Sequence, residues 1–455
     1  MSKIEVNTVE PQCGTTLTLG GSGDTVILGS GASQSGFGRS GSVNWQTTPK
    51  TATFTAADGE GYFINQSSAI TMNLPAGSAG AIVAVSDYAR NFATYNLTIT
   101  PNGSEKIGGN SGSATLNVNG QAATFVYVDG TKGWVNVQNA EDTEIGAQYI
   151  TATGGTITTV CTNFKVHTFT SPGTFCVSAG DGPLAIVDYE VVGGGGGSSV
   201  GGGGGGGYRA AKTGNNGSYT ASPLSNPTGV PISPGAIPIT VGAGGAKSSG
   251  SNCIASQGSS SVFSTITSAG GGGGANYNGQ CSSNPNSVGG PGGSGGGGGA
   301  FNNPSNTEAG GTGNTPPVSP PQGTDGGDGS YDAPTHTAGG GGGGASAAGS
   351  DAPADGAPTT SSGGGVGGAG VTNNITASPV ARSGGGGGGV NTTGSTGPFA
   401  GGTGGGGAGV SPASSPSNGT AGTANTGGGG GGGSPGPSRG ASGGSGIVII
   451  RYRFQ

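Results

Sequence analysis

Residues 46–140 alternate between apolar and polar positions in the way that β-strands do. Segments such as ATFTA from Ala52 and ATFVYV from Ala123 recur about every ten residues. Turn-forming pairs such as Asp58-Gly59 and Asp129-Gly130 separate these segments. The spacing predicts a β-sandwich spacer over residues 46–140. We expect its core to contain Trp134, Phe125 and Tyr127.

Two shorter patterns flank this predicted sandwich. Residues 1–45 contain the alternating runs TLTL and TVIL between Gly-Ser-Gly turns, and each run is too short to bury a core alone. Such runs need neighbours, either as rungs of a β-helix or as strands from other subunits in an intertwined trimer. We therefore predict a β-rich stalk or attachment segment over residues 1–45, and a polar linker over residues 141–164.

The second half of the chain begins and ends with apolar strand patterns. These are FKVHTFTSPGTFCV from Phe164, AIVDYEVV from Ala185, AIPITV from Ala236 and IVIIRYRF from Ile447. We expect the four segments to pair in a small β-sheet. Because they bracket everything between them, the sheet would close a single domain over residues 165–455.

Composition narrows the possible fold classes. Of 455 residues, 112 are Gly and 27 are Pro, which excludes a helical bundle. The glycines come in blocks and not at every third position, which excludes a collagen. Charged residues make up 7% and the net charge is -6, so no basic surface for nucleic acid is expected. No apolar run approaches the about 20 residues of a membrane span, and no signal peptide is evident at the N-terminus.

Eight runs of four or more glycines divide the second half of the chain. They begin at Gly193, Gly201, Gly270, Gly295, Gly339, Gly384, Gly404 and Gly427. Polyglycine can form a helix of the polyproline II type, which has no internal hydrogen bonds, so its backbone groups must bond to neighbouring helices. Only Gly allows backbones to approach so closely. The sequence therefore predicts an all-β fold combined with a polyglycine II scaffold, essentially without α-helix.

The segments between the glycine runs are rich in Asn, Ser, Thr and Pro and carry scattered aromatic residues. Variable polar loops on a rigid scaffold are typical of binding surfaces, and Tyr offers contact area at a low entropic cost. The candidate receptor-binding residues are Tyr208, Tyr219, Tyr277, Phe301, Tyr331 and Phe399. The alternative is that these side chains only cover loop backbone.

Catalytic and metal-binding patterns are sparse. His167 and His336 are the only histidines, and the two G-x-S-x-G strings follow no predicted strand. The segment GTDGGDGSYD from Gly323 is a single copy of a calcium-type repeat, for which a solvated loop is the simpler interpretation. Cys161 and Cys176 could pair, as could Cys253 and Cys281, or all five cysteines could stay free. We predict no enzyme activity, no cofactor and no metal.

Several of these segments resemble a known family. FTSPGTFCV, AIVDYEVVGGGGG, ITVGAGG and GGSGIVIIRY together resemble the glycine-rich domain of bacteriophage tail-fibre proteins over about residues 165–455. The arrangement of apolar strands and glycine runs is similar to that of the receptor-binding adhesin at the tip of T-even-like long tail fibres. The N-terminal part is similar to the stalk and shaft domains of marine-phage fibres. The resemblance implies a stack of polyglycine II helices whose distal loops contact a bacterial surface.

From the resemblance we expect a host-surface adhesin carried on the virion and assembled in the bacterial cytoplasm as a homotrimer. Its loops would bind a bacterial surface glycan or an outer-membrane protein, and its N-terminus would bind other tail-fibre or virion proteins. Neither nucleic acid nor membrane insertion is expected. The alternative is a purely structural fibre, virion decoration or appendage subunit without a specific receptor.

Overall fold

The structure is a computed structural model that describes residues 43–138, 149–180, 184–249, 254–277, 288–300, 308–332, 336–353, 363–390, 399–411, 418–434 and 439–455. Within these ranges the chain forms 25 β-strands and no α-helix, which confirms the all-β prediction. None of the described residues belongs to a helix that could cross a membrane. The strands fall into two compact units, of which the first contains β1 to β9. The predicted stalk, residues 1–45, lies almost entirely outside the described residues.

Two facing sheets make up the first unit. One has the order β1-β3-β5-β8-β9 and the other the order β2-β4-β6-β7. The strands are β1 (Asn44–Lys50), β2 (Phe54–Thr55), β3 (Glu60–Ile64), β4 (Ile70–Asn73), β5 (Ile82–Asp87), β6 (Leu97–Thr100), β7 (Ala114–Leu116), β8 (Ala122–Asp129) and β9 (Gly133–Asn136). The rings of Phe54 and Tyr62, which belong to different sheets, lie 4.8 Å apart. Trp134 and Phe125 are fully buried, as predicted, and Tyr127 is partly buried.

The strand pairing in this unit differs from that of an antiparallel sandwich. β1, β3 and β5 pair in parallel, and so do β2, β4 and β6. The chain therefore alternates between the sheets and stacks each coil on the previous one. Asp58-Gly59 links β2 to β3 across the sheets instead of closing a hairpin. At the β8–β9 hairpin, in contrast, Asp129 Oδ1 accepts from the amides of Thr131 and Lys132 at 2.8 and 2.7 Å.

The second unit is built on two further sheets, which share one core. Their orders are β11-β12-β25-β14-β15-β16, with β17 paired to β14, and β10-β13-β18-β19-β20. The strands are β10 (Thr151–Thr153), β11 (Thr156–Val160), β12 (Phe164–Phe169), β13 (Gly173–Ala179), β14 (Ile186–Val192), β15 (Tyr208–Ala211), β16 (Ser225–Asn226), β17 (Val230–Pro231), β18 (Gly235–Thr240), β19 (Ser261–Phe263), β20 (Ile266–Ser268) and β25 (Ile447–Arg453). Phe175, Tyr189, Phe263 and Tyr452 pack in the core between them.

The C-terminal strand β25 closes this unit. It pairs antiparallel with β12 on one side and with β14 on the other. The segments before the first glycine run and after the last one are therefore neighbours, as the apolar patterns predict. The prediction of a single sheet is wrong, because β13 and β18 pair with each other in the other sheet. The prediction of a linker is wrong for residues 149–164, because this segment contains the strands β10 and β11. The Thr-rich sequence TATGGTITTV suits strands better than a linker.

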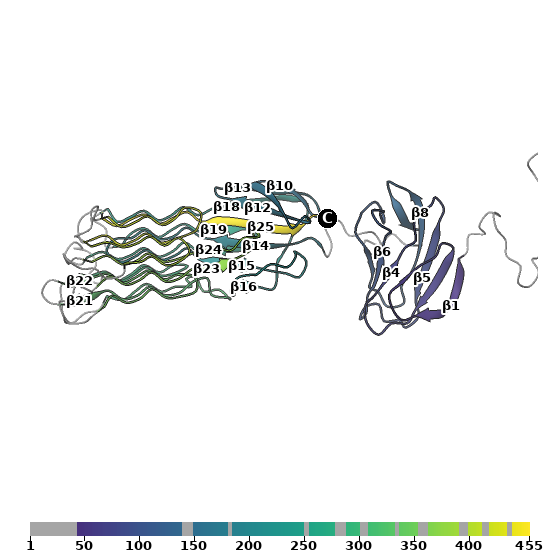
Figure 1. Ribbon diagram of the computed structural model, residues 1–455, viewed down its shortest axis with the longest axis horizontal. Coiled ribbons are helices and arrows are strands. Elements are labelled where there is room, and N and C mark those ends of the chain that lie inside the picture. The colour runs from purple at the N-terminus through teal and green to yellow at the C-terminus, as the bar shows by residue number, and fades with distance from the viewer. Residues whose placement is uncertain are drawn as a thin grey trace, which may run out of the picture. The chain divides into compact units, whose positions relative to one another are not determined.

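Beyond the sheets, the chain runs back and forth in glycine-rich segments, which we call tracts (Figure 1). The tract of residues 201–207 shows how they are joined. Its amides donate to three other tracts in turn, at 2.8 to 3.0 Å, through the carbonyls of Ala275, Gly340 and Gly430 and then those of Gly272, Gly343 and Gly427. Every third amide therefore returns to the same neighbour. This is the repeat of a helix with three residues per turn.

The carbonyls of the same tract join it to three more tracts. Gly203, Gly204 and Gly205 accept from the amides of Gly386, Gly196 and Ser294, respectively. The tract of residues 201–207 thus has six tract neighbours, three through its donors and three through its acceptors. Lateral bonding to several neighbours is a property expected of polyglycine II helices, and the polyglycine II conformation itself stays a prediction.

The close approach of the tracts leaves no room for side chains. An ideal Cβ at Gly203 would lie 2.1 Å from the carbonyl oxygen of Gly196, and one at Gly342 would lie 2.0 Å from that of Gly203. Real Cβ atoms essentially never come closer than 3.0 Å to another heavy atom. Gly214, outside the tracts, has no heavy atom within 4 Å of its ideal Cβ. Glycine is therefore required in the tracts by direct contact between backbones.

Serine hydroxyls join the sheets to the tracts. Ser261 Oγ donates to the carbonyl of Val192 at 2.7 Å and accepts from the amide of Gly242 at 2.9 Å. Ser268 Oγ donates to the carbonyl of Gly207 at 2.5 Å. These hydroxyls form hydrogen bonds with backbone groups at the junction, where the chain passes from a strand into a tract.

The tracts have two distinct ends. β14 precedes the tract of residues 193–197, and β15 follows that of residues 201–207, so both tracts adjoin the sheets at what we call the sheet end. The hairpin of β21 (Ser330–Asp332) and β22 (His336–Ala338) lies at the opposite end, which we call the far end (Figure 1). The hairpin of β23 (Val371–Asn373) and β24 (Val380–Arg382) lies at the sheet end (Figure 1).

A buried ion pair holds the β23–β24 hairpin against β14. Arg382 Nη1 donates to Glu190 Oε1 at 3.0 Å, and the two side chains are 7% and 0% exposed. Glu190 Oε2 and Arg382 Nε have no hydrogen-bond partner among the described residues. Burial raises the pKa of Glu190 to about 7, although the nearby Arg382 acts in the opposite direction. The ionised carboxylate is thus disfavoured in the folded chain.

We expect Gly203→Ala to destabilise the second unit strongly. Overpacking of an interior usually costs about 1–3 kcal/mol, and here the added methyl group would meet rigid backbone. Thermal unfolding of the full chain measures the effect, with Gly214→Ala as the matched control that should change stability little. An unchanged melting temperature for Gly203→Ala would show that the tracts do not pack in this way.

We expect Glu190 to make the second unit less stable as pH rises from about 4.5 towards 7. Over this interval the folded chain retains a proton at Glu190 that the unfolded chain has released, so the free energy of unfolding falls with pH. One pKa unit corresponds to about 1.4 kcal/mol. Glu190→Gln should flatten this slope in melts recorded between pH 5 and 8. A variant that keeps the slope of the wild type would assign it to other groups.

Candidate binding surface at the far end of the tracts

At the far end, backbone hydrogen bonds join the ends of neighbouring tracts to one another. The Gly339 amide donates to the Gly389 carbonyl at 2.9 Å, the Gly389 amide to the Val200 carbonyl at 2.8 Å, and the Val200 amide to the Ala275 carbonyl at 3.1 Å. These residues come from four tracts that are distant in sequence. The lattice of hydrogen bonds therefore brings distant parts of the chain to one surface.

A small apolar cluster covers part of this surface. Ala338, Ala352 and Val390 are buried together, and the partly buried ring of Phe399 packs against them. Ala338 and Val390 also form a β-bridge. Phe399 thus packs beside both the end of the β21–β22 hairpin and the end of a glycine tract.

Eight segments of the sequence follow described residues of the far end and lie themselves outside the described residues. They are residues 250–253, 278–287, 301–307, 333–335, 354–362, 391–398, 412–417 and 435–438. Their sequences consist mainly of Asn, Ser, Thr, Pro and Gly, and Asp355 is their only charged residue. These eight sequences are therefore polar but almost uncharged.

Three of the six predicted aromatic residues belong to the far end. Tyr277 follows the tract end at Ala275 and is half-buried. Tyr331 is the central residue of β21. Phe399 packs on the apolar cluster. Phe301 lies outside the described residues, directly after the buried Ala300 in the sequence.

The other two predicted residues, Tyr208 and Tyr219, lie at the sheet end. Tyr208 begins β15 and is 1% exposed, and its hydroxyl accepts from Asn373 Nδ2 at 2.9 Å. The Tyr219 hydroxyl donates to Asp188 Oδ2 at 2.9 Å. The sequence does not reveal that Tyr208 lies at the sheet end, because the apolar pattern around it is too short to predict the strand β15. Both residues support the packing of the sheet end.

Aspartates complete the hydrogen bonding at one edge of the tracts. Asp325 Oδ1 accepts from the Gly313 amide at 2.7 Å, and Asp328 Oδ1 accepts from the Gly310 amide at 2.8 Å. The two aspartates are three residues apart, so the repeat of three directs both to the same neighbouring tract. Among the described residues, no group of three or more His, Cys, Asp or Glu is arranged to hold a metal ion. The segment from Gly323 is thus part of the lattice edge.

The described histidine and cysteine side chains do not come together in a catalytic arrangement. His167 is buried, with Nδ1 2.7 Å from the Gly154 carbonyl oxygen and Nε2 3.0 Å from the Tyr452 hydroxyl. Burial lowers the pKa of His167, so the ring favours its neutral form. Cys161 and Cys176, one possible pair from the sequence, are free and exposed thiols. The other three cysteines lie outside the described residues.

A comparison with known protein families identifies the second unit as a glycine-rich domain. A family model described as a glycine-rich domain matches residues 169–453. This range runs from the last residue of β12 to the last residue of β25 and includes every described tract. No curated protein matches the chain. Because the family model covers more than half of the 455 residues, the chain belongs to the glycine-rich domain family.

Proposed function

We propose that the chain is a bacteriophage tail-fibre receptor-binding protein that attaches to a bacterial surface through its far end. The observation that supports this proposal most directly is that hydrogen bonds gather the described ends of four distant tracts at the end opposite the sheets. In the sequence, the segments that follow the described residues of this end are polar. A rigid scaffold that presents variable segments on one side is a common design for recognition. In this proposal the N-terminal part connects to other tail-fibre or virion proteins.

The chemistry of the connecting segments favours a surface glycan or the polar loops of an outer-membrane protein as the partner. Amide and hydroxyl side chains form neutral hydrogen bonds with such surfaces, and the near absence of charge argues against attraction by a highly charged partner. Tyr277 and Phe399 add aromatic area beside these segments. Single contacts of this kind are weak. A homotrimer, repeated on several fibres of one virion, would strengthen attachment through avidity.

The test is a set of exchanges in the full chain, assayed by binding of the labelled protein to a panel of bacterial cells. Replacing residues 354–362 or 391–398 by Gly-Ser sequences of equal length should reduce binding at least about tenfold, since the tracts remain while the polar contacts are removed. The matched control replaces residues 170–172, an exposed turn at the sheet end, and should bind as the wild type does.

Two outcomes would contradict the proposal. If the full chain binds no cell in a broad panel, a purely structural fibre, decoration or appendage subunit becomes the better interpretation. If it binds but every far-end exchange leaves binding unchanged, recognition lies elsewhere in the chain. Melting curves of each variant show whether the tracts remain folded.

A further inference from the structure

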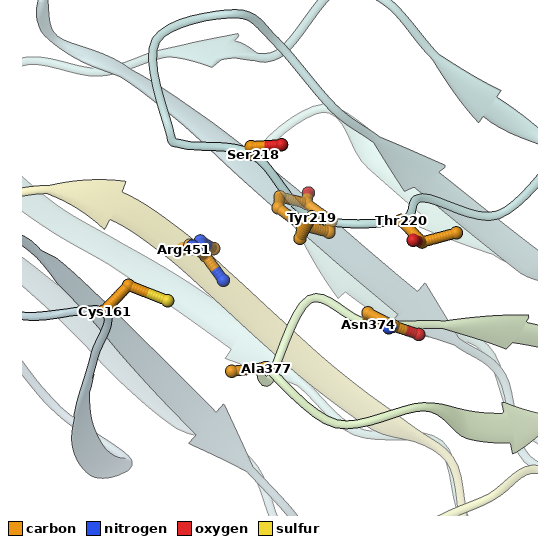
Figure 2. A pocket seen from close by; sticks show the side chains of 7 residues that line it. All are labelled: Cys161, Ser218, Tyr219, Thr220, Asn374, Ala377 and Arg451. Atoms are coloured by element: carbon orange, nitrogen blue, oxygen red, sulfur yellow. The ribbon is translucent and has the colours of Figure 1, made fainter.

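A pocket of about 390 Å³ opens at the sheet end, away from the proposed receptor surface (Figure 2). Four parts of the second unit form it: the turn between β11 and β12, the segment after β15, the turn between β23 and β24, and strand β25. Their lining residues include Cys161, Ser218, Tyr219, Asn374 and Arg451. Apart from Arg451, the side chains that line it carry no full charge.

Arg451 forms the floor of this pocket. It is 0% exposed, and its guanidinium lies between the rings of Phe164 and Tyr219, at 4.9 and 4.6 Å from their centroids. Nε donates to the Asn216 carbonyl and Nη1 to the Ile375 carbonyl, both at 3.0 Å. Nη2 has no hydrogen-bond partner among the described residues. Figure 2 shows the guanidinium directed into the space between Cys161 and Ala377.

Arg451 forms no direct ion pair with a carboxylate of the described residues, although the charges of the buried Asp188 and of Arg451 both act on Tyr219. Asp188 is its register partner across β14 and β25. However, Asp188 Oδ1 accepts from Thr213 and from Asn216, and Oδ2 accepts from Tyr219. The other buried carboxylate of β14, that of Glu190, pairs with Arg382. A buried cation without a paired anion is unfavourable, and the two aromatic faces offset only part of that cost.

We propose that this pocket binds the carboxylate of a sugar acid. Nη2 of Arg451 donates to a carboxylate oxygen and so gives the guanidinium the anion that it lacks. The hydroxyls of Ser218 and Thr220 and the amide of Asn374 line the remaining space and bond to the sugar hydroxyls. The volume is at the lower end of the range for small-molecule sites, which fits a single sugar ring. The inference is independent of the proposed function, because the pocket lies at the sheet end.

Cys161 provides a direct readout in the full chain. It lines the pocket as an exposed thiol, whereas Cys176 is exposed on β13, outside it. Glucuronate should slow the modification of Cys161 by a maleimide severalfold and leave Cys176 unaffected, as measured by mass spectrometry of the two peptides. Glucose, which lacks the carboxylate, and acetate, which lacks the hydroxyls, should protect far less at equal concentration. Equal protection by glucose or by acetate would overturn the proposal.

A matched pair of variants tests the role of charge. Ser218→Glu places a carboxylate at the rim of the pocket, and Ser218→Gln has the same size without the charge. By calorimetry, the Glu variant should bind glucuronate at least about tenfold more weakly than the Gln variant, because its own carboxylate competes for Arg451. Equal affinities would overturn the assignment of Arg451 as the anion-binding group. Arg451→Gln should abolish binding, and the Ser218 pair decides the question if that variant does not fold.

Discussion

The backbone hydrogen bond between different tracts is the interaction on which the second unit depends. In the tract of residues 201–207, each amide bonds outside its own tract, so this tract has no stabilising hydrogen bonds of its own. Glycine also loses more backbone freedom on folding than any other residue, at about 1–2 kcal/mol per ordered residue. Order therefore arises only when many tracts form their bonds together. This cooperativity explains why the glycine runs recur along the chain with similar lengths.

The sheets supply what the glycine runs cannot, namely a hydrophobic core and a fixed starting position. Phe175, Phe263 and Tyr452 bury apolar area between the two sheets, whereas the tracts have almost no side chains to bury. β14 and β25 are adjacent and each continues into a tract or follows one, so their spacing is imposed on the lattice. The hydroxyls of Ser261 and Ser268 carry the hydrogen bonding across the junction.

Much of the fold can be predicted from the sequence because the responsible signals are local. Runs of glycine, the apolar strands around them and the alternation in residues 46–140 are each visible within about ten residues. The parallel pairing of β1, β3 and β5 is not predictable in this way, because turn pairs such as Asp58-Gly59 occur both in hairpins and in turns between sheets. The strands β10 and β11 escape prediction because their Thr-rich sequence also looks like a polar linker.

The candidate sites are harder to predict, since they depend on where each tract finishes. Tyr208 and Tyr277 both follow a glycine-rich tract, yet one lies at the sheet end and the other at the far end. Only the hydrogen-bond partners of the tracts distinguish the two cases. Arg451 gives one usable signal, a charged residue within the apolar segment IVIIRYRF. Its lack of a direct ion pair becomes visible only in the structure, where the carboxylate of Asp188 bonds to neutral groups such as the Tyr219 hydroxyl.

The repeat of three in the tracts also limits how such a chain can change in evolution. Inserting one residue into a tract would turn every later amide by a third of a rotation, towards the wrong neighbour. Inserting three would restore the phase and lengthen the tract by about 9 Å. Insertions between tracts face no such rule, because the entropy of a loop grows only slowly with its length. The scaffold should therefore vary in steps of three residues while the segments at its ends diversify freely.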